Sequence, residues 1–202
     1  MKPRTSLTNS ESRRLTMFIL YASIFFGITV GSCVFAFIGR DMSHNVLFSQ
    51  YISPLNSGET LFQAFKYSAL TYTVYITVLM LAGFFVFGNI AGVALVIYRG
   101  TGIGIAVGSL YLTFGVKAML LTLLLIVPKI LATTVIVILA ARESMRLSSK
   151  LYRFLFREDS IGDGMRKFVK LYFIKFLILE LFMVLIAVLE SVLNYLLIDF
   201  CV

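Results

Sequence analysis

The chain has 202 residues, of which 59% are apolar and 14% carry a charge, and its formal net charge at pH 7 is +8. So few charged residues cannot cover the surface of a soluble enzyme. The composition suits a protein that is surrounded by lipid. The basic residues cluster beside apolar segments, which argues against nucleic-acid binding. Two cysteines and one histidine without metal-ligand spacing argue against a metal site. We therefore predict an all-α, polytopic membrane protein with no cofactor and no metal.

The first apolar segment follows a short basic tail. No charged residue occurs between Arg14 and Arg40, which is typical of a retained transmembrane helix rather than a cleaved signal peptide, and we predict a span at 16–38. The positive-inside rule predicts that residues 1–15 form a cytoplasmic tail. Residues 40–60 are then expected to form an extracytoplasmic loop.

The next apolar region is rich in glycine. We predict a second span at 62–82 and a third element at 85–114, separated by a break near Gly83. Glycines four residues apart line one face of a helix and favour close packing of two helices in a membrane. The same pattern is also typical of a broken or re-entrant element, and this alternative remains open. The glycines concerned are Gly88, Gly92, Gly100, Gly104, Gly108 and Gly115.

Two further spans complete the predicted membrane domain, which covers 16–202. The fourth, at 116–141, contains Pro128, which we expect to kink the helix. The fifth lies at 172–198. The segment 142–170 between them is strongly basic and is therefore also expected in the cytoplasm, which requires an even number of earlier crossings. Five spans then place the C-terminus on the extracytoplasmic side of the membrane.

Four charged residues fall well inside the predicted spans, away from their first turns, although a charge at the centre of a membrane helix costs about 2.5–3.5 kcal/mol. One interpretation is a substrate or ion pathway, or a polar surface that docks a helix of a partner. The other is a set of internal ion pairs that fix the order of the helices, or side chains that reach the membrane interface. The four residues are Arg99, Lys129, Glu180 and Glu190.

The segment 142–157 has basic residues at helical spacing. They recur every three or four positions, so they share one face of a helix beside an apolar stripe. We expect this amphipathic helix to continue the fourth span and to lie along the inner leaflet, where anionic lipids attract basic side chains. A docking surface for a cytoplasmic partner is the alternative. The basic residues are Arg142, Arg146, Lys150, Arg153 and Arg157.

Several motifs occur in a familiar order along 98–190. They are Tyr98-Arg99-Gly100, the spaced Gly104 and Gly108, Gly115 with Lys117, Val127-Pro128-Lys129, and a final helix that carries Glu190. This order resembles the stage II sporulation protein M family of bacterial membrane proteins. The valine before the proline departs from the Leu-Pro-type pair expected in that family.

The resemblance implies a non-catalytic scaffold of the sporulation engulfment machinery in the bacterial cytoplasmic (inner) membrane. Such a scaffold anchors and localises peptidoglycan hydrolase partners with extracytoplasmic domains, which would contact 40–60 or the outer ends of the spans. The sequence contains no P-loop, dinucleotide fingerprint, HExxH or GxSxG motif, which agrees with a protein that is not an enzyme. A transporter subunit or small permease that uses the intramembrane charges is the alternative function. A homo-oligomer is also compatible with the sequence.

Overall fold

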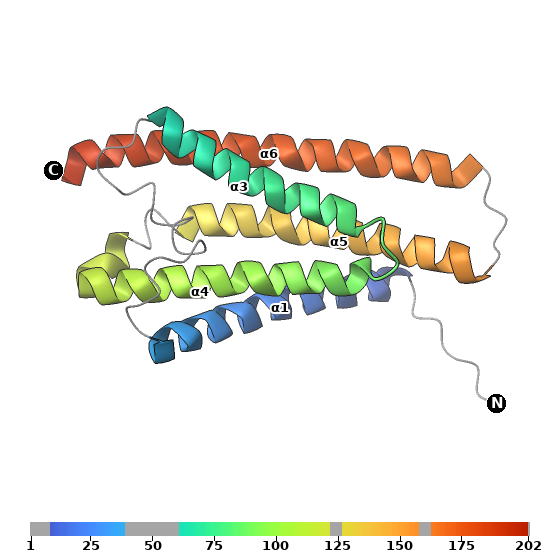
Figure 1. The fold of residues 1–202 in the computed structure, drawn as a ribbon, viewed down its shortest axis with the longest axis horizontal. Coiled ribbons are helices and arrows are strands. Elements are labelled where there is room, and N and C mark those ends of the chain that lie inside the picture. Colours follow the sequence, from blue (N-terminus) through green and yellow to red (C-terminus); the bar gives the residue numbers. More distant parts are fainter. Residues whose placement is uncertain (1–8, 39–60, 122–126, 158–162, 202) are drawn as a thin grey trace.

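The computed structural model describes residues 9–38, 61–121, 127–157 and 163–201, and every regular element in this part of the chain is an α-helix. The helices lie side by side in a bundle, and successive helices run in opposite directions (Figure 1). The predicted all-α fold is confirmed. The helices are α1 (Asn9–Ile38), α3 (Leu61–Ala82), α4 (Gly88–Leu121), α5 (Val127–Arg157) and α6 (Asp163–Cys201).

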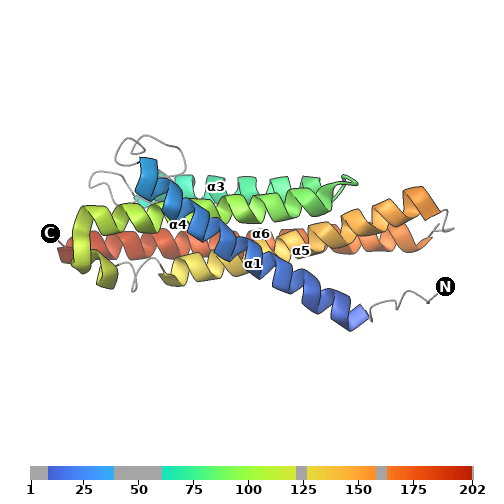
Figure 2. The same cartoon turned by 90° about the horizontal axis from the view of Figure 1, so that it is seen from below.

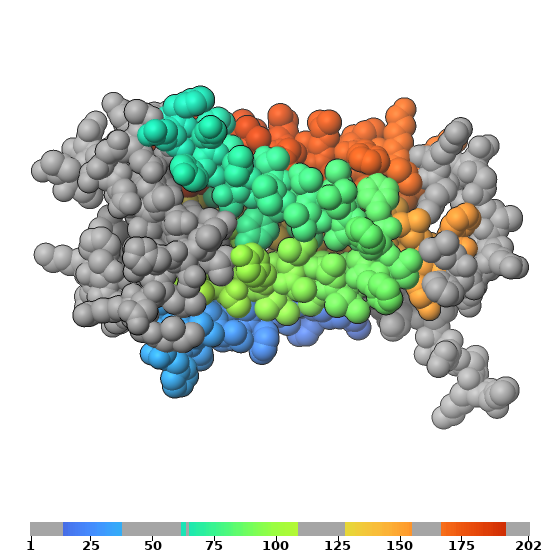
Figure 3. All heavy atoms as spheres, in the orientation of Figure 1, coloured from blue at the N-terminus to red at the C-terminus, as the bar shows by residue number. Residues whose placement is uncertain are grey.

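The surface of the bundle exposes large apolar side chains. Phe18, Phe25 and Leu177 are 74%, 68% and 70% exposed, and the space-filling view shows α3 and α4 side by side on one face (Figure 3). A hydrocarbon core about 30 Å thick is crossed by about 20 helical residues. Within the described ranges, four helices contain segments long and apolar enough to do so, as expected of a membrane protein. These segments are Arg14–Phe37, Phe65–Ala82, Gly88–Gly108 and Lys167–Val192.

Helix α5 differs from these four and corrects the predicted fourth span. The expected helix 116–141 is divided, because α4 ends at Leu121 and α5 begins at Val127. Pro128 is the second residue of α5. At that position its missing N–H interrupts no helical hydrogen bond, so the predicted kink within a span is wrong.

Helix α5 is nevertheless the central helix of the bundle. It contacts each of the other four helices, and Val137, Ile138 and Ala141 on it are at most 1% exposed. Its first half contains Lys129, and Arg142 and Glu143 follow, which lowers its hydropathy below that of its neighbours. Contacts with four other helices cover part of its surface, although Leu131 and Val135 remain 60% and 46% exposed.

The glycine-rich element forms one continuous helix, α4, of 34 residues. The chain reverses before it, at 83–87, where the backbone N–H of Phe85 donates to the carbonyl of Ala82 at 3.1 Å. The expected break between the second and third elements therefore lies here. A break at the midpoint of 85–114 does not occur, although the C-terminal end of α4 turns away from the helix axis (Figure 2).

Candidate functional site

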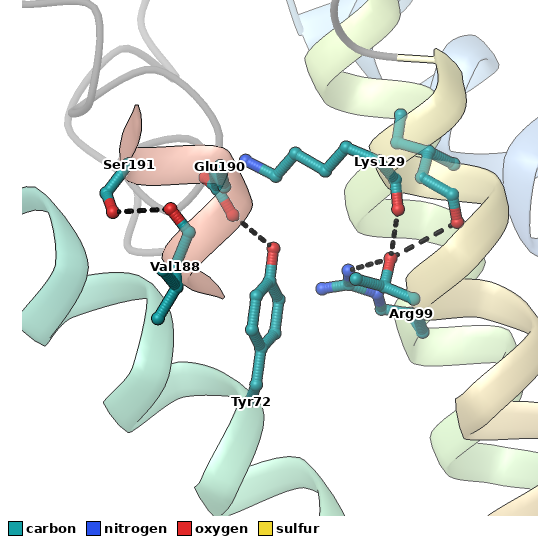
Figure 4. A network of polar contacts seen from close by, with 8 residues as sticks. Tyr72, Arg99, Lys129, Val188, Glu190 and Ser191 are labelled. Carbon is teal, nitrogen blue, oxygen red and sulfur yellow. Dashed lines mark hydrogen bonds and ion pairs between the residues drawn. The ribbon is translucent and has the colours of Figure 1, made fainter. Parts of the chain in front are cut away.

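One group of buried polar residues surrounds Glu190 of α6. Lys129 of α5 forms an ion pair with its Oε1 atom, and the hydroxyl of Tyr72 of α3 donates a hydrogen bond to Oε2 at 2.7 Å (Figure 4). The side chain of Glu190 is 3% exposed and that of Lys129 is 15% exposed. The carboxylate therefore connects three helices inside the bundle.

Arg99 of α4 lies beside this ion pair and is 2% exposed. Its Nη2 atom donates to the hydroxyl of Thr133 at 3.1 Å, and that hydroxyl lies 2.9 Å from the carbonyl oxygen of Lys129. The guanidinium carbon lies 5.7 Å and 5.3 Å from the ring centres of Tyr72 and Tyr75, which are cation–π distances. Tyr72 thus contacts Arg99 with its ring and Glu190 with its hydroxyl.

We call Tyr72, Arg99, Lys129, Thr133 and Glu190 the polar cluster. A buried ion pair adds little net stability, but removing one partner leaves a buried charge and costs about 3–5 kcal/mol. The pairing of Lys129 with Glu190 is the internal arrangement that the sequence left open. Sequence reasoning missed Tyr72 and Thr133. Thr133 lies four residues after Lys129, so helical spacing offered a signal for it, whereas no local pattern links Tyr72 to Glu190.

Glu180 lies apart from the polar cluster, near the middle of the segment Lys167–Val192. It is half-buried and accepts a hydrogen bond from the hydroxyl of Thr73 on α3. Both residues line an open groove of about 580 Å³ between α3 and α6, whose other walls include Ile76 and Leu177. The carboxylate therefore faces an apolar groove at the surface of the bundle.

The glycines of α4 pack against α1. A Cβ atom on Gly100 would lie 3.0 Å from the Cα of Gly27, and one on Gly104 would lie 3.1 Å from the Cα of Gly31. Carbonyl oxygens of α1 would lie closer still, that of Ile24 to the Cβ atom on Gly100 and that of Ile28 to the one on Gly104, and real Cβ atoms are not found so close to backbone. The two helices therefore approach at a distance that only glycine allows. The prediction named Gly100 and Gly104 but missed Gly27 and Gly31, although their spacing of four was present in the sequence.

The remaining predicted glycines have different neighbours. A Cβ atom on Gly92 would lie 3.2 Å from the side chain of Met145 on α5, and one on Gly108 would lie 2.9 Å from the ring of Phe35 on α1. Gly88 begins α4 and packs against Ser148 of α5. Gly115 belongs to α4, but its packing lies outside the described part of the chain. The glycines thus serve two interfaces of α4.

The basic residues of 142–157 lie on α5 and partly contact α6. Glu143 accepts a hydrogen bond from Arg146 at 2.9 Å and another from Lys175 of α6 at 2.9 Å. The amine of Lys150 lies 3.3 Å from the ring centre of Phe168 on α6. Some of this face therefore joins two helices instead of facing lipid. Arg142 is half-buried, Arg153 is exposed and Arg157 ends α5.

The pKa values of Glu143 and Lys150 are both shifted. Burial raises the pKa of the Glu143 carboxyl, but hydrogen bonds from Lys175 and Arg146 outweigh it and hold that pKa below its usual range. Burial, with repulsion from Arg146 and Arg153, lowers the pKa of the Lys150 amine. Glu143 is therefore charged at neutral pH and holds two cations from different helices.

Comparison of the chain with protein-family models, curated proteins and solved structures found no match.

Proposed function

We propose that this protein is a non-catalytic scaffold of a bacterial cytoplasmic membrane that anchors peptidoglycan hydrolase partners. The alternating helix directions suit five crossings of the membrane. The end of the bundle that contains the basic residues of 142–157, which we call the basic end, then lies in the cytoplasm and the C-terminus lies outside. The identity of the partners rests on the resemblance to the stage II sporulation protein M family. A role in engulfment follows from the same resemblance.

One observation supports a docking role most directly: Glu180 faces an open groove in the middle of a membrane segment. Its described hydrogen-bond partner is the uncharged Thr73. A carboxylate at this depth is costly unless a cation or a proton compensates it. A membrane helix with a lysine or arginine near its middle would supply both the charge and apolar surface for the groove.

A second copy of this chain is a poorer occupant of the groove. Near the depth of Glu180, Lys129 is paired with Glu190, Lys175 is paired with Glu143, and Arg99 is 2% exposed. These three cations are therefore already engaged or covered within the chain. We therefore expect the groove between α3 and α6 to receive the membrane anchor of a hydrolase that carries a basic residue in its span.

Co-purification tests the proposal. An N-terminally tagged chain would be extracted from its native membrane in mild detergent, and the bound proteins identified by mass spectrometry. We expect a hydrolase with a basic residue in its membrane anchor, and we expect Glu180→Gln to lose it. Glu143→Gln makes the same chemical change outside the groove and should retain it.

Three outcomes would contradict parts of the proposal separately. Equal recovery of the hydrolase with Glu180→Gln would reject the groove as the docking site but keep the scaffold. Recovery of a second copy of the chain alone would indicate a homo-oligomer. Absence of any hydrolase from the unsubstituted protein would reject the scaffold itself.

A transporter subunit remains the second candidate, and the composition of the polar cluster favours it. Arg99 and Lys129 outnumber Glu190 there, so the cluster suits an anionic substrate. Efflux of chloride, phosphate and acetate from liposomes that contain the protein would test this function. Lys129→Met should abolish the flux in a folded protein if the cluster lies on a pathway, and normal flux in that variant would contradict it.

A further inference from the structure

A pocket of about 520 Å³ lies at the basic end of the bundle, between the start of α4 and the C-terminal part of α5. It is separate from the polar cluster and from the groove that holds Glu180. Asn89 and Ser149 line it, and the amide of Asn89 donates to the hydroxyl of Ser149 at 3.1 Å. The exposed Arg153 lines the same pocket. One side of the pocket is therefore polar and cationic.

The other side of the pocket is apolar and open. Phe87 and Ile90 line it and are 75% and 69% exposed. These residues directly precede and begin the apolar segment Gly88–Gly108, so they lie where a membrane surface meets the basic end. A ligand that fits both sides carries an anionic group and an apolar chain.

An anionic phospholipid has this combination of groups. The planar guanidinium of arginine matches the geometry of phosphate oxygens and forms two parallel hydrogen bonds with them. Basic pockets between membrane helices on the cytoplasmic side bind anionic head groups in this way. Arg146 and Lys150 on the same helix add positive charge, and the nearby Glu143 is occupied by Arg146 and Lys175.

We propose that this pocket binds the phosphate of an anionic phospholipid, with Arg153 as the phosphate ligand and Ile90 beside the acyl chains. The site goes beyond the scaffold function and does not depend on it. It also differs from a diffuse attraction of basic residues to the membrane, because it assigns one arginine and one pocket.

Lipid titration of the full chain tests this site. Phosphatidylglycerol would be added to the protein in a neutral detergent, which removes the charged membrane surface, and bound lipid measured by native mass spectrometry. Arg153→Gln should weaken binding about tenfold or more, as expected for the loss of a charge-assisted hydrogen bond. Arg142→Gln removes the same charge from α5 outside the pocket and should stay within about twofold of the unsubstituted protein.

A second pair of variants tests the pocket without removing a basic residue. Ile90→Glu places a carboxylate beside the phosphate and should weaken binding, whereas the uncharged Ile90→Gln should retain most of it. Equal weakening by Arg153→Gln and Arg142→Gln, or by the two Ile90 variants, would overturn the proposal. Displacement of the lipid by equimolar glycerol phosphate would also overturn it, because the ligand would then be a soluble phosphate ester.

Discussion

The two halves of the bundle are held together by different chemistry. On one side α1 and α4 meet through glycines, and Gly27 and Gly31 bring their backbone against Gly100 and Gly104. On the other side α3, α5 and α6 are joined by long polar side chains that converge on Glu190. The contact of α1 with α4 depends on the absence of side chains at these glycines. The contact of α3, α5 and α6 depends on opposite charges and hydrogen bonds that compensate one another.

This difference has a consequence for substitution. A side chain added at the glycine interface meets backbone that cannot move aside, so a second substitution elsewhere does not repair it. A charge removed from the polar cluster can be compensated by removing its partner, because two apolar residues of similar volume often replace a buried ion pair at little cost. The two halves should therefore respond differently to paired substitutions.

The largest effect is expected from Glu190→Leu. It leaves Lys129 buried beside Arg99 without an anion, which should lower the free energy of unfolding by about 3–5 kcal/mol. Denaturation with sodium dodecyl sulfate in mixed micelles, followed by circular dichroism, measures this change. The double variant Lys129→Met with Glu190→Leu should recover most of the loss, and equal damage in both proteins would contradict the pairing.

Gly104→Leu should have the next largest effect. Its side chain meets backbone atoms of α1, including the Ser32 nitrogen, which would lie 2.9 Å from the new Cβ atom. Overpacking of this kind costs about 1–3 kcal/mol. The same denaturation assay measures it, with Ala94→Leu on the exposed side of α4 as the control. Similar stability of these two variants would argue against close contact of α1 with α4.

Tyr72→Phe tests the hydrogen bond between α3 and α6. The substitution keeps the ring over Arg99 and removes only the hydroxyl that donates to Glu190. We expect a loss of about 1 kcal/mol, between the average for membrane hydrogen bonds and that for bonds to charged groups. Removal of the equivalent atom by Tyr67→Phe, at an exposed position of α3, should change the unfolding free energy much less.

The smallest effect is expected at Glu143, which joins α5 to α6 through Lys175 near the basic end. Glu143→Gln should cost no more than about 1 kcal/mol, because the pair is partly exposed. The pKa of this carboxyl is lowered in the folded protein, so its contribution is present above the unfolded value of about 4.3 and is lost as pH falls below that value. Unfolding curves of the two proteins should therefore converge in acid, and a constant difference at all pH values would contradict this assignment.

The sequence predicted the features that depend on local spacing. Long apolar segments indicated helices in the regions of α1, α3 and α6, although α1 and α6 begin earlier than predicted, and the glycine repeat on α4 indicated a close helix interface. Two features depended on tertiary structure and were not predictable in this way. Pro128 was predicted in the middle of a span because the sequence around it is apolar. It lies instead at the start of α5, because the position of a helix start depends on where the chain turns.

The polar cluster illustrates the same limit. The free-energy cost of a charge inside a membrane was enough to identify Arg99, Lys129 and Glu190 as residues that need a partner. Which of them pair depends on the depth and rotation of α4, α5 and α6, and those are set by packing along the whole bundle. Tyr72 was missed because tyrosine is common in membrane helices and only its position opposite Glu190 gives it a role.

The proposed function gives two glutamates of α6 different roles, with Glu190 holding the bundle together and Glu180 holding a partner. The most direct test compares Glu180→Gln and Glu190→Gln in the same two assays, unfolding free energy and recovery of the membrane partner. We predict that Glu190→Gln lowers the unfolding free energy, whereas Glu180→Gln keeps the fold and loses the partner. A stable Glu190→Gln protein, together with a Glu180→Gln protein that retains its partner, would show that neither glutamate has its proposed role.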